Sequence, residues 1–393
     1  MSSKKTPFLS TISKIFIKRI AEYFKAGIEE FHLRQSNKSI DVSEIYTSET
    51  TALKKGLKYT YINEEIQRSI DSSIWIGQSI SFLINSKKIT IHFIHPCKSI
   101  LKESNKIQKF FQNIHLQIFA WLYVASLESE KECSKNLTIY IYFTDFKKSL
   151  PHVKKTPLGE INVNTGFTFS CNLSAGENEM YIYRKEEWFK VLIHECFHAF
   201  SLDFSGLSRE LIEKTDQKVI QMFPLHIDLR FYETYCEMWA ELLQIIYLNY
   251  EKISQLDNEK TIWSDFERML KIDQKHSVEQ ATKILKHHHM GYMDLFEKTD
   301  RAQQKRMEYG EISPVISYYI LKSLFYMHIG RYIEWTSINN KGTLRFLKTE
   351  TSVNSYVELL REIYQSPKYI EMMKKCEKLT GGDNYLRMSC WEA

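Results

Sequence analysis

Residues 186–200 read EEWFKVLIHECFHAF, and this stretch decides the fold that the sequence predicts. Its apolar residues, from Trp188 to Ala199, recur at three- and four-residue steps, which is the spacing of an amphipathic helix. The stretch also contains the pattern H-E-x-x-H, with His194 and His198 as its histidines. Histidines four residues apart lie about 40° apart around a helix, so both imidazoles can reach one ion. The pattern predicts a zinc site, with Glu195 beside a metal-bound water.

A second stretch, residues 229–250, is apolar almost all the way round and predicts a buried helix. Its charged residues fall within an arc of about 80° on a helical wheel. Bare carboxylates are costly in a core, so we expect a cation to neutralise this stripe. A catalytic zinc usually has three protein ligands, and this helix is expected to supply the third. The spacing leaves three carboxylates open as that ligand, and in a fold without metal Arg230 would pair with Glu233 or Glu237. The charged residues are Arg230, Glu233, Glu237 and Glu241.

The segment Glu237-Met238-Trp239-Ala240-Glu241 resembles a signature of the gluzincins, which are zinc peptidases with H-E-x-x-H on one helix and a glutamate on a later one. It is similar to the E-F-F-A-E type of the lethal-factor-like and Mlc-titration-factor-like branch. There the first glutamate binds the metal and the second supports a histidine. The resemblance implies that Glu237 is the third ligand and that Glu241 lies behind a histidine.

The resemblance covers residues 137–250, and the pattern as a whole is similar to predicted metallopeptidases of large DNA viruses. A strand directly before the His194 helix also resembles the zincin arrangement, in which an edge strand receives the substrate backbone. The resemblance therefore implies a zincin-like core and a protein or peptide substrate.

Changes of periodicity predict the remaining elements. We expect helices over 8–35 and 104–127, a hairpin of strands 79–83 and 89–93, and strands over 137–143, 162–169 and 180–183. Nearly all of the chain beyond residue 187 has a helical period. The prediction is a helix-rich α+β fold with a small mixed sheet. We expect an N-terminal α/β region over 1–130, a catalytic core over 131–290 and a C-terminal helical region over 291–393.

Composition excludes several classes of protein. A chain of 393 residues with 43% hydrophobic and 26% charged positions is not disordered over most of its length. A net charge of +5 without a basic stripe argues against nucleic-acid binding. No apolar run reaches the roughly 18 to 20 residues that span a bilayer. Seven scattered cysteines without a C-x-x-C pair favour reduced thiols and an intracellular, cytoplasmic protein, or a virion component if the chain is viral, rather than a secreted one.

These residues predict a zinc metallopeptidase. Zinc held by His194, His198 and Glu237 would activate a water for attack on a peptide carbonyl, and Glu195 would act as the general base. A further side chain is expected to stabilise the oxyanion. The sequence does not rank its candidates, which are Tyr232, Tyr235, Tyr318, Tyr319 and His328.

Two other functions fit the same residues. A carboxypeptidase or a deconjugating hydrolase would use the same site on a different bond. A catalytically silent, zinc-stabilised structural or interaction protein would need the ligands but not Glu195, because a structural ion has no chemical use for a general base.

Overall fold

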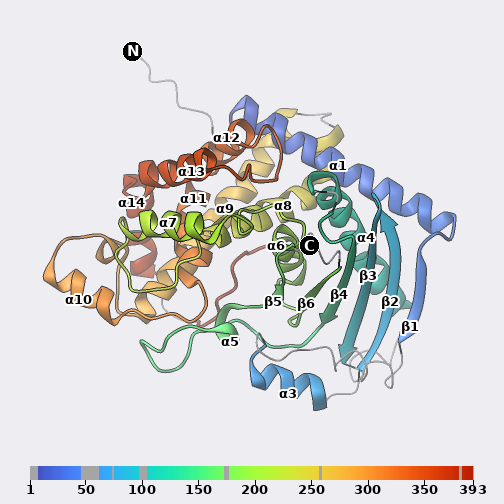
Figure 1. Cartoon of the computed structure of the whole chain (residues 1–393), viewed down its shortest axis with the longest axis horizontal. Helices are drawn as coiled ribbons and strands as arrows, with labels where there is room; N and C mark the ends of the chain where they lie inside the picture. The colour runs from blue at the N-terminus through green and yellow to red at the C-terminus, as the bar shows by residue number, and fades with distance from the viewer. Residues whose placement is uncertain are drawn as a thin grey trace.

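The computed structural model of the chain describes residues 8–45, 62–72, 75–96, 104–130, 132–171, 177–255, 259–379 and 383–392. The fold is α+β and rich in helix, as the sequence predicts (Figure 1). None of the helices that the structure describes has an apolar stretch long enough to cross a bilayer. The helices are α1 (Thr11–Ser36), α3 (Glu64–Ser72), α4 (Ser104–Glu128), α5 (Glu160–Val163), α6 (Trp188–Ala199), α7 (Arg209–Ile220), α8 (Phe231–Gln255), α9 (Glu259–His287), η2 (Tyr292–Leu295), α10 (Asp300–Glu308), η3 (Ile316–Leu321), α11 (Lys322–Met327), α12 (Ile329–Asn339), α13 (Glu350–Ile363) and α14 (Pro367–Leu379).

The strands that the structure describes form one mixed sheet of six strands in the order β1-β2-β3-β4-β6-β5. The predicted hairpin is confirmed, because β2 and β3 pair antiparallel around Asn85 and Ser86, whose φ angles of 46° and 67° suit a tight hairpin turn. Parallel pairing joins β4 to both β3 and β6, whereas β5 runs antiparallel to β6 at the edge. The strands are β1 (Asp41–Ile45), β2 (Trp75–Ile84), β3 (Lys87–Pro96), β4 (Asn136–Tyr142), β5 (Gly166–Thr168) and β6 (Glu177–Ile182).

The edge strand β5 is shorter than the predicted strand 162–169. Residues Glu160–Val163 form the helical turn α5 instead. The Asn162 side chain accepts a hydrogen bond from the backbone N–H of Gly159 at 3.1 Å, which fixes the start of that turn. The strand begins only at Gly166, where an added Cβ would lie 2.8 Å from the carbonyl oxygen of Tyr181. The extended edge is therefore confined to three residues beside α6.

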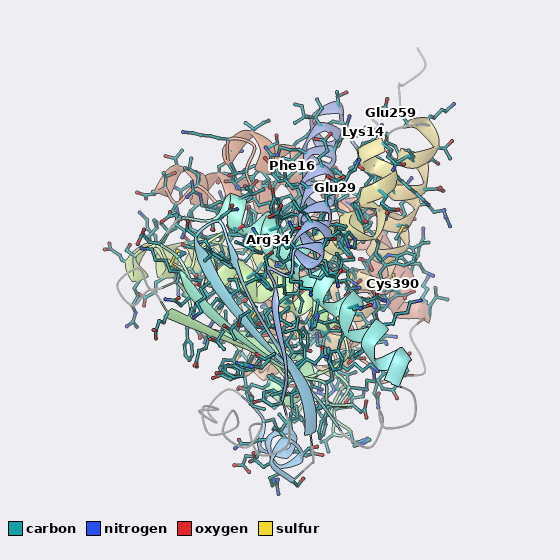
Figure 2. All side chains as sticks on the ribbon, turned by 90° about the vertical axis from the view of Figure 1, so that its right-hand side faces the viewer. Lys14, Phe16, Glu29, Arg34, Glu259 and Cys390 are labelled. Carbon is teal, nitrogen blue, oxygen red and sulfur yellow. A yellow bond between two sulfur atoms is a disulfide. The ribbon has the colours of Figure 1, made fainter. Side chains whose placement is uncertain are left out.

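The main core packs helices against one face of the sheet and against each other, and a smaller cluster packs α3 against the other face. Helix α1 lies against α4 and α8, and its Phe16, labelled in Figure 2, is buried in the main hydrophobic cluster. The Phe16 ring lies 5.5 Å from the ring of Trp239 on α8. The main hydrophobic cluster contains residues of all three regions that the sequence predicts, and the sheet joins strands on both sides of residue 130. The region boundaries at residues 130 and 290 stay predictions.

One cysteine prediction is wrong. Cys133 and Cys171 form a disulfide with a Cα–Cα distance of 5.4 Å, whereas the sequence favours reduced thiols throughout. The two residues are 38 positions apart and are brought together by the pairing of β4 with β6. No local pattern in the sequence predicts this pairing. Free thiols are found at Cys196, Cys236, Cys376 and Cys390, and Cys97 lies outside the described residues. The predicted cytoplasmic setting therefore loses its support from the cysteines.

Candidate metal centre

Helix α6 carries the H-E-x-x-H residues and is buried along almost its whole length. It ends at Phe200, after which Ser201 takes a left-handed conformation with φ 58°. The N–H of Leu202 then donates to the carbonyl of Phe197 at 2.8 Å, which is the hydrogen bond of a Schellman turn. This turn folds the chain back over the last turn of α6. As a result Asp203, five residues after His198, can reach its ring.

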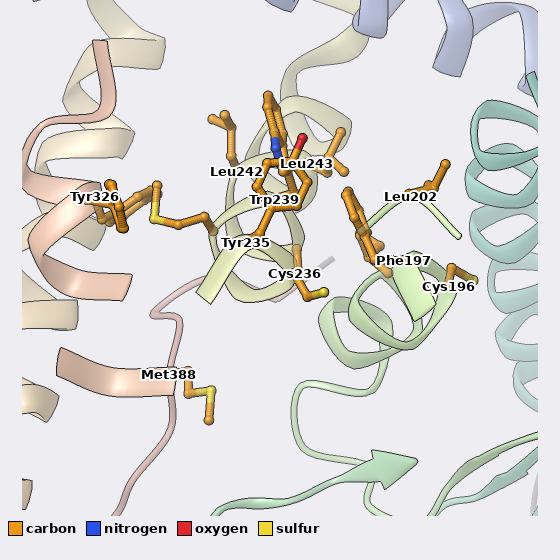
Figure 3. Packing of buried hydrophobic residues seen from close by; sticks show 14 of the residues in the cluster. Cys196, Phe197, Leu202, Tyr235, Cys236, Trp239, Leu242, Leu243, Tyr326 and Met388 are labelled. Carbon is orange, nitrogen blue, oxygen red and sulfur yellow. The ribbon is translucent and has the colours of Figure 1, made fainter. Parts of the chain in front are cut away.

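Helix α8 supplies the carboxylates that face α6. Its apolar side chains Tyr235 and Trp239 pack into the core, and Figure 3 shows Phe197 of α6 beside them. The rings of Phe197 and Tyr235 lie 6.0 Å apart. These contacts fix the rotation of each helix about its axis, so the side of α8 that carries Glu233 and Glu237 meets the two histidines.

Three ligand atoms converge between these helices. Glu233 Oε2 lies 3.1 Å from His194 Nε2 and 3.3 Å from His198 Nε2. The two imidazole rings are 5.1 Å apart, and none of the three residues is more than 8% exposed. This buried group could hold a metal ion. Two imidazole nitrogens and one carboxylate oxygen are a donor set that suits zinc, with a fourth position left for water.

The glutamate at this point is Glu233, whereas the sequence favours Glu237 as the third ligand. Both oxygens of Glu237 face other groups, because Oε1 lies 3.2 Å from His194 Nδ1 and Oε2 lies 2.5 Å from Lys190 Nζ. The gluzincin resemblance implies one glutamate at the metal and a second glutamate behind a histidine. In the structure these two positions are occupied by Glu233 and Glu237, one helical turn before the expected Glu237 and Glu241. The geometry favours Glu233 as the ligand.

The carboxylates of the acidic stripe have separate partners. Glu241, predicted to lie behind a histidine, pairs instead with Lys322 at 2.5 Å, and both side chains are fully buried. Burial raises the pKa of Glu241 well above its usual value despite this partner. Arg230 pairs with Asp228 at 3.1 Å, so the metal-free pairing with Glu233 or Glu237 that we considered does not form.

His198 has its own carboxylate on the far side of the ring. Asp203 Oδ2 lies 2.8 Å from His198 Nδ1, and the hydroxyl of Ser205 donates to Asp203 Oδ1 at 2.9 Å. A carboxylate that accepts a hydrogen bond from Nδ1 leaves Nε2 free as the metal-binding nitrogen. Cys236 lies 3.9 Å from the same Nδ1, and His198, Asp203 and Cys236 form a second group that could hold a metal ion. The two groups use opposite nitrogens of one ring.

Glu195 lines a small cavity beside His194, Gly166 and Tyr318. The cavity volume is about 20 Å³, which is room for about one water molecule. Burial raises the pKa of Glu195, although the charges of His194 and His198 act in the opposite direction. A carboxylate beside a cavity that fits one water is placed to accept a proton from that water.

Tyr318 is the oxyanion candidate that the structure places at this cavity. Its ring centroid lies 5.9 Å from that of His194. Burial, together with the charges of Glu233, Glu195 and Glu237, raises its pKa well above the usual value, so its hydroxyl stays a hydrogen-bond donor. Tyr232 lies on the other side, 5.9 Å from the ring of His198.

The remaining oxyanion candidates lie elsewhere. The Tyr235 hydroxyl donates to the carbonyl of Leu344 at 2.7 Å, and the Tyr319 hydroxyl donates to the carbonyl of Leu386 at 2.7 Å. His328 lines a separate pocket beside Phe8 and Lys368, and burial lowers its pKa to about 4. All three candidates are therefore wrong as partners of this centre.

Sequence reasoning missed Asp203 and Lys190 as parts of the centre. An aspartate just after the end of the H-E-x-x-H helix, and a lysine four residues before the first histidine, are the signals that could have found them. Neither signal says what the side chain contacts.

Searches of protein-family models, of curated proteins and of solved structures found no match to this chain. The gluzincin resemblance thus stays a prediction from the motif residues. The geometry of the centre carries the functional argument.

Proposed function

We propose that the protein is a zinc-dependent metallopeptidase whose metal ligands are His194, His198 and Glu233. The observation that carries the proposal is the convergence of two Nε2 atoms and one carboxylate oxygen beside Glu195 and a cavity for one water. Zinc bound there supplies a water that is acidic enough to lose a proton near neutral pH, and it polarises a carbonyl. No other side chain is needed to make a nucleophile.

The protein's own groups account for the proton transfers. Glu195 accepts a proton from the attacking water and passes it to the leaving amine. Tyr318 donates its hydroxyl hydrogen to the oxygen of the tetrahedral intermediate. Asp203 accepts a hydrogen bond from Nδ1 of His198, and Glu237 Oε1 lies at ion-pair distance from Nδ1 of His194, so that Nε2 of each ring would be the nitrogen that binds the ion.

A protein or peptide substrate is supported by the edge of the sheet. Strand β5 pairs with β6 along one side only and ends the sheet next to α6. An extended peptide can add to such an edge through its backbone, as the zincin resemblance implies. Gly166 of β5 lines the same cavity as Glu195, so a peptide on this edge would pass beside the general base.

One observation favours a second candidate, a catalytically silent protein stabilised by zinc. The ligands and Glu195 are all at most 8% exposed, and the cavity beside them is too small for a peptide. A structural zinc site is closed in this way, whereas a peptidase must open to admit its substrate.

Metal analysis followed by a peptide assay separates the two. We expect one zinc per chain, and cleavage of a quenched fluorescent peptide pool that a chelator stops and added zinc restores. Zinc-loaded protein that melts at a lower temperature after chelation, but cleaves nothing in that pool, would refute the peptidase and support the structural protein. Mass spectrometry of the products distinguishes an endopeptidase from a carboxypeptidase or a deconjugating hydrolase.

A further inference from the structure

Lys190 is a charged residue at the centre of the molecule that the proposed reaction does not use. Its side chain is completely buried on α6. Lys190 precedes His194 by four residues, so the two side chains lie on one face of the helix. Its ammonium lies 2.5 Å from Glu237 Oε2, and the other oxygen of Glu237 lies 3.2 Å from His194 Nδ1. Ammonium, carboxylate and imidazole thus form a continuous chain.

We propose that Lys190 is a positioning residue for the metal centre, acting on His194 through Glu237. The ammonium holds one carboxylate oxygen, so the other oxygen points at Nδ1 of the imidazole. An acceptor at Nδ1 fixes the hydrogen there and leaves Nε2 unprotonated for the ion. The inference rests on the proposed zinc site and adds to it the group that keeps the supporting carboxylate oriented.

The neighbours of Lys190 hold its ammonium in place. Met388 Sδ lies 3.1 Å from Lys190 Nζ, and Lys148 with its partner Glu187 lies on the same side. Lys148 is bound to Glu187 at 2.8 Å, which leaves Glu237 to Lys190. A buried carboxylate without its ammonium partner is costly, so Glu237 without Lys190 would turn away from its present position. This change would take the carboxylate away from His194.

The chain contains a matched control for the pair of Lys190 and Glu237, namely Lys322 of α11 with Glu241 of α8. Glu241, one turn after Glu237 on α8, pairs with Lys322 at the same 2.5 Å distance, and both partners are at most 1% exposed. Neither of these residues contacts a histidine of the centre. Removing either lysine takes the nearest ammonium away from one buried glutamate, but only Glu237 also contacts a proposed metal ligand, His194.

The experiment measures zinc affinity by competition with a chromophoric chelator, and stability by urea unfolding. Lys190→Met is expected to weaken zinc binding by about 10- to 100-fold. Lys322→Met is expected to lower stability to a similar extent while changing zinc affinity less than about threefold, and Lys190→Arg to keep most of the affinity, since it keeps the charge. Folded Lys190→Met that binds zinc as tightly as the unaltered protein, or Lys322→Met that weakens binding equally, would overturn the inference.

If Lys190→Met does not fold, the double variant Lys190→Met/Glu237→Gln tests whether Lys190 acts through Glu237. The amide leaves no charge unpaired and keeps an oxygen that can accept from Nδ1. We expect this protein to fold and to bind zinc as tightly as the single variant Glu237→Gln, which is about 10- to 100-fold more weakly than the unaltered chain. Binding more than 100-fold weaker would show that Lys190 does not act through Glu237. If the unaltered chain itself binds no zinc, the proposed function fails, and that result is distinct from every outcome above.

Discussion

Removal of the metal should make this protein lose stability as the pH rises, because its histidines then carry protons in place of the ion. Burial lowers the pKa of His194, but the charge of Glu237 and hydrogen bonds to Glu233 and Glu237 raise it overall, from 6.5 to about 9. Burial also lowers the pKa of His198. The charges of Cys236, Glu233 and Asp203 raise it, and the resulting pKa lies well above the usual value of a histidine. In the metal-free protein both rings are therefore charged near neutral pH.

The size of the effect follows from His194. A pKa that rises from 6.5 to about 9 on folding corresponds to roughly 3 kcal/mol of stability. Because the folded-state pKa is the higher one, this contribution is fully present below pH 6.5 and is lost as the pH rises through about 9. The two histidine charges outweigh burial and lower the pKa of Glu233 to about 2, so its contribution is constant above its ordinary pKa of 4.5.

Urea unfolding between pH 6 and pH 10, with and without zinc, measures this loss. Other groups that titrate in this range, such as Lys87, whose pKa burial lowers to about 8, contribute equally to both forms and cancel in their difference. We expect the stability gained from zinc to grow by several kcal/mol between pH 6.5 and 9. In the double variant His194→Gln/His198→Gln this growth should vanish. A zinc contribution that is independent of pH in the unaltered protein would refute the arrangement of ligands described above.

Four substitutions test the proposed roles of residues in the centre. Glu195→Gln should retain zinc, raise the free energy of unfolding because it removes a buried charge, and lower peptide turnover at least about 100-fold; unchanged turnover in a steady-state assay would exclude Glu195 as the base. Glu233→Gln should abolish stoichiometric zinc binding, whereas Glu237→Gln should weaken zinc binding only about 10- to 100-fold. If metal analysis gave the reverse order, Glu237 and not Glu233 would be the third ligand. Tyr318→Phe should lower kcat about 100-fold with zinc content unchanged, and an unaltered kcat would exclude it as the oxyanion donor.

The sequence could predict which helices carry the centre but not their register. Helical periodicity identifies α6, and the nearly continuous apolar surface of residues 229–250 identifies α8 as a buried helix. Glu233, Glu237 and Glu241 lie one turn apart on the same side, and a slide of about 5.4 Å along the axis exchanges their roles. Contacts such as that of Phe197 with Tyr235 set this slide, and these contacts join residues far apart in the chain. The motif alone therefore places the third ligand one turn from where the geometry does.

The residues that support the ligands could not be predicted for a related reason. Lys190 is a single cation in an apolar helix, and only the approach of α8 gives it Glu237 as a partner. Asp203 depends on the left-handed residue Ser201, a conformation for which the sequence offers no glycine. The disulfide of Cys133 and Cys171 depends in the same way on how the strands pair. Local patterns predict the elements, whereas these contacts arise only when the elements assemble.

Glu195 bears most directly on the choice between a peptidase and a structural zinc protein. Its carboxylate is buried at 7% exposure, burial raises its pKa, and none of the described residues donates a hydrogen bond to it. Such a group destabilises the fold, since an apolar or amide side chain of similar size would avoid the cost of burying the charge. Glu233 and Glu237 differ, because each has a histidine or lysine partner that outweighs burial and lowers the pKa of its carboxyl. A buried carboxylate without such a partner, beside a cavity that fits one water, has a use in proton transfer and none in holding a structural ion. The proposed peptidase activity then requires an opening between β5 and Tyr318, because the present cavity beside Glu195 is too small for a peptide.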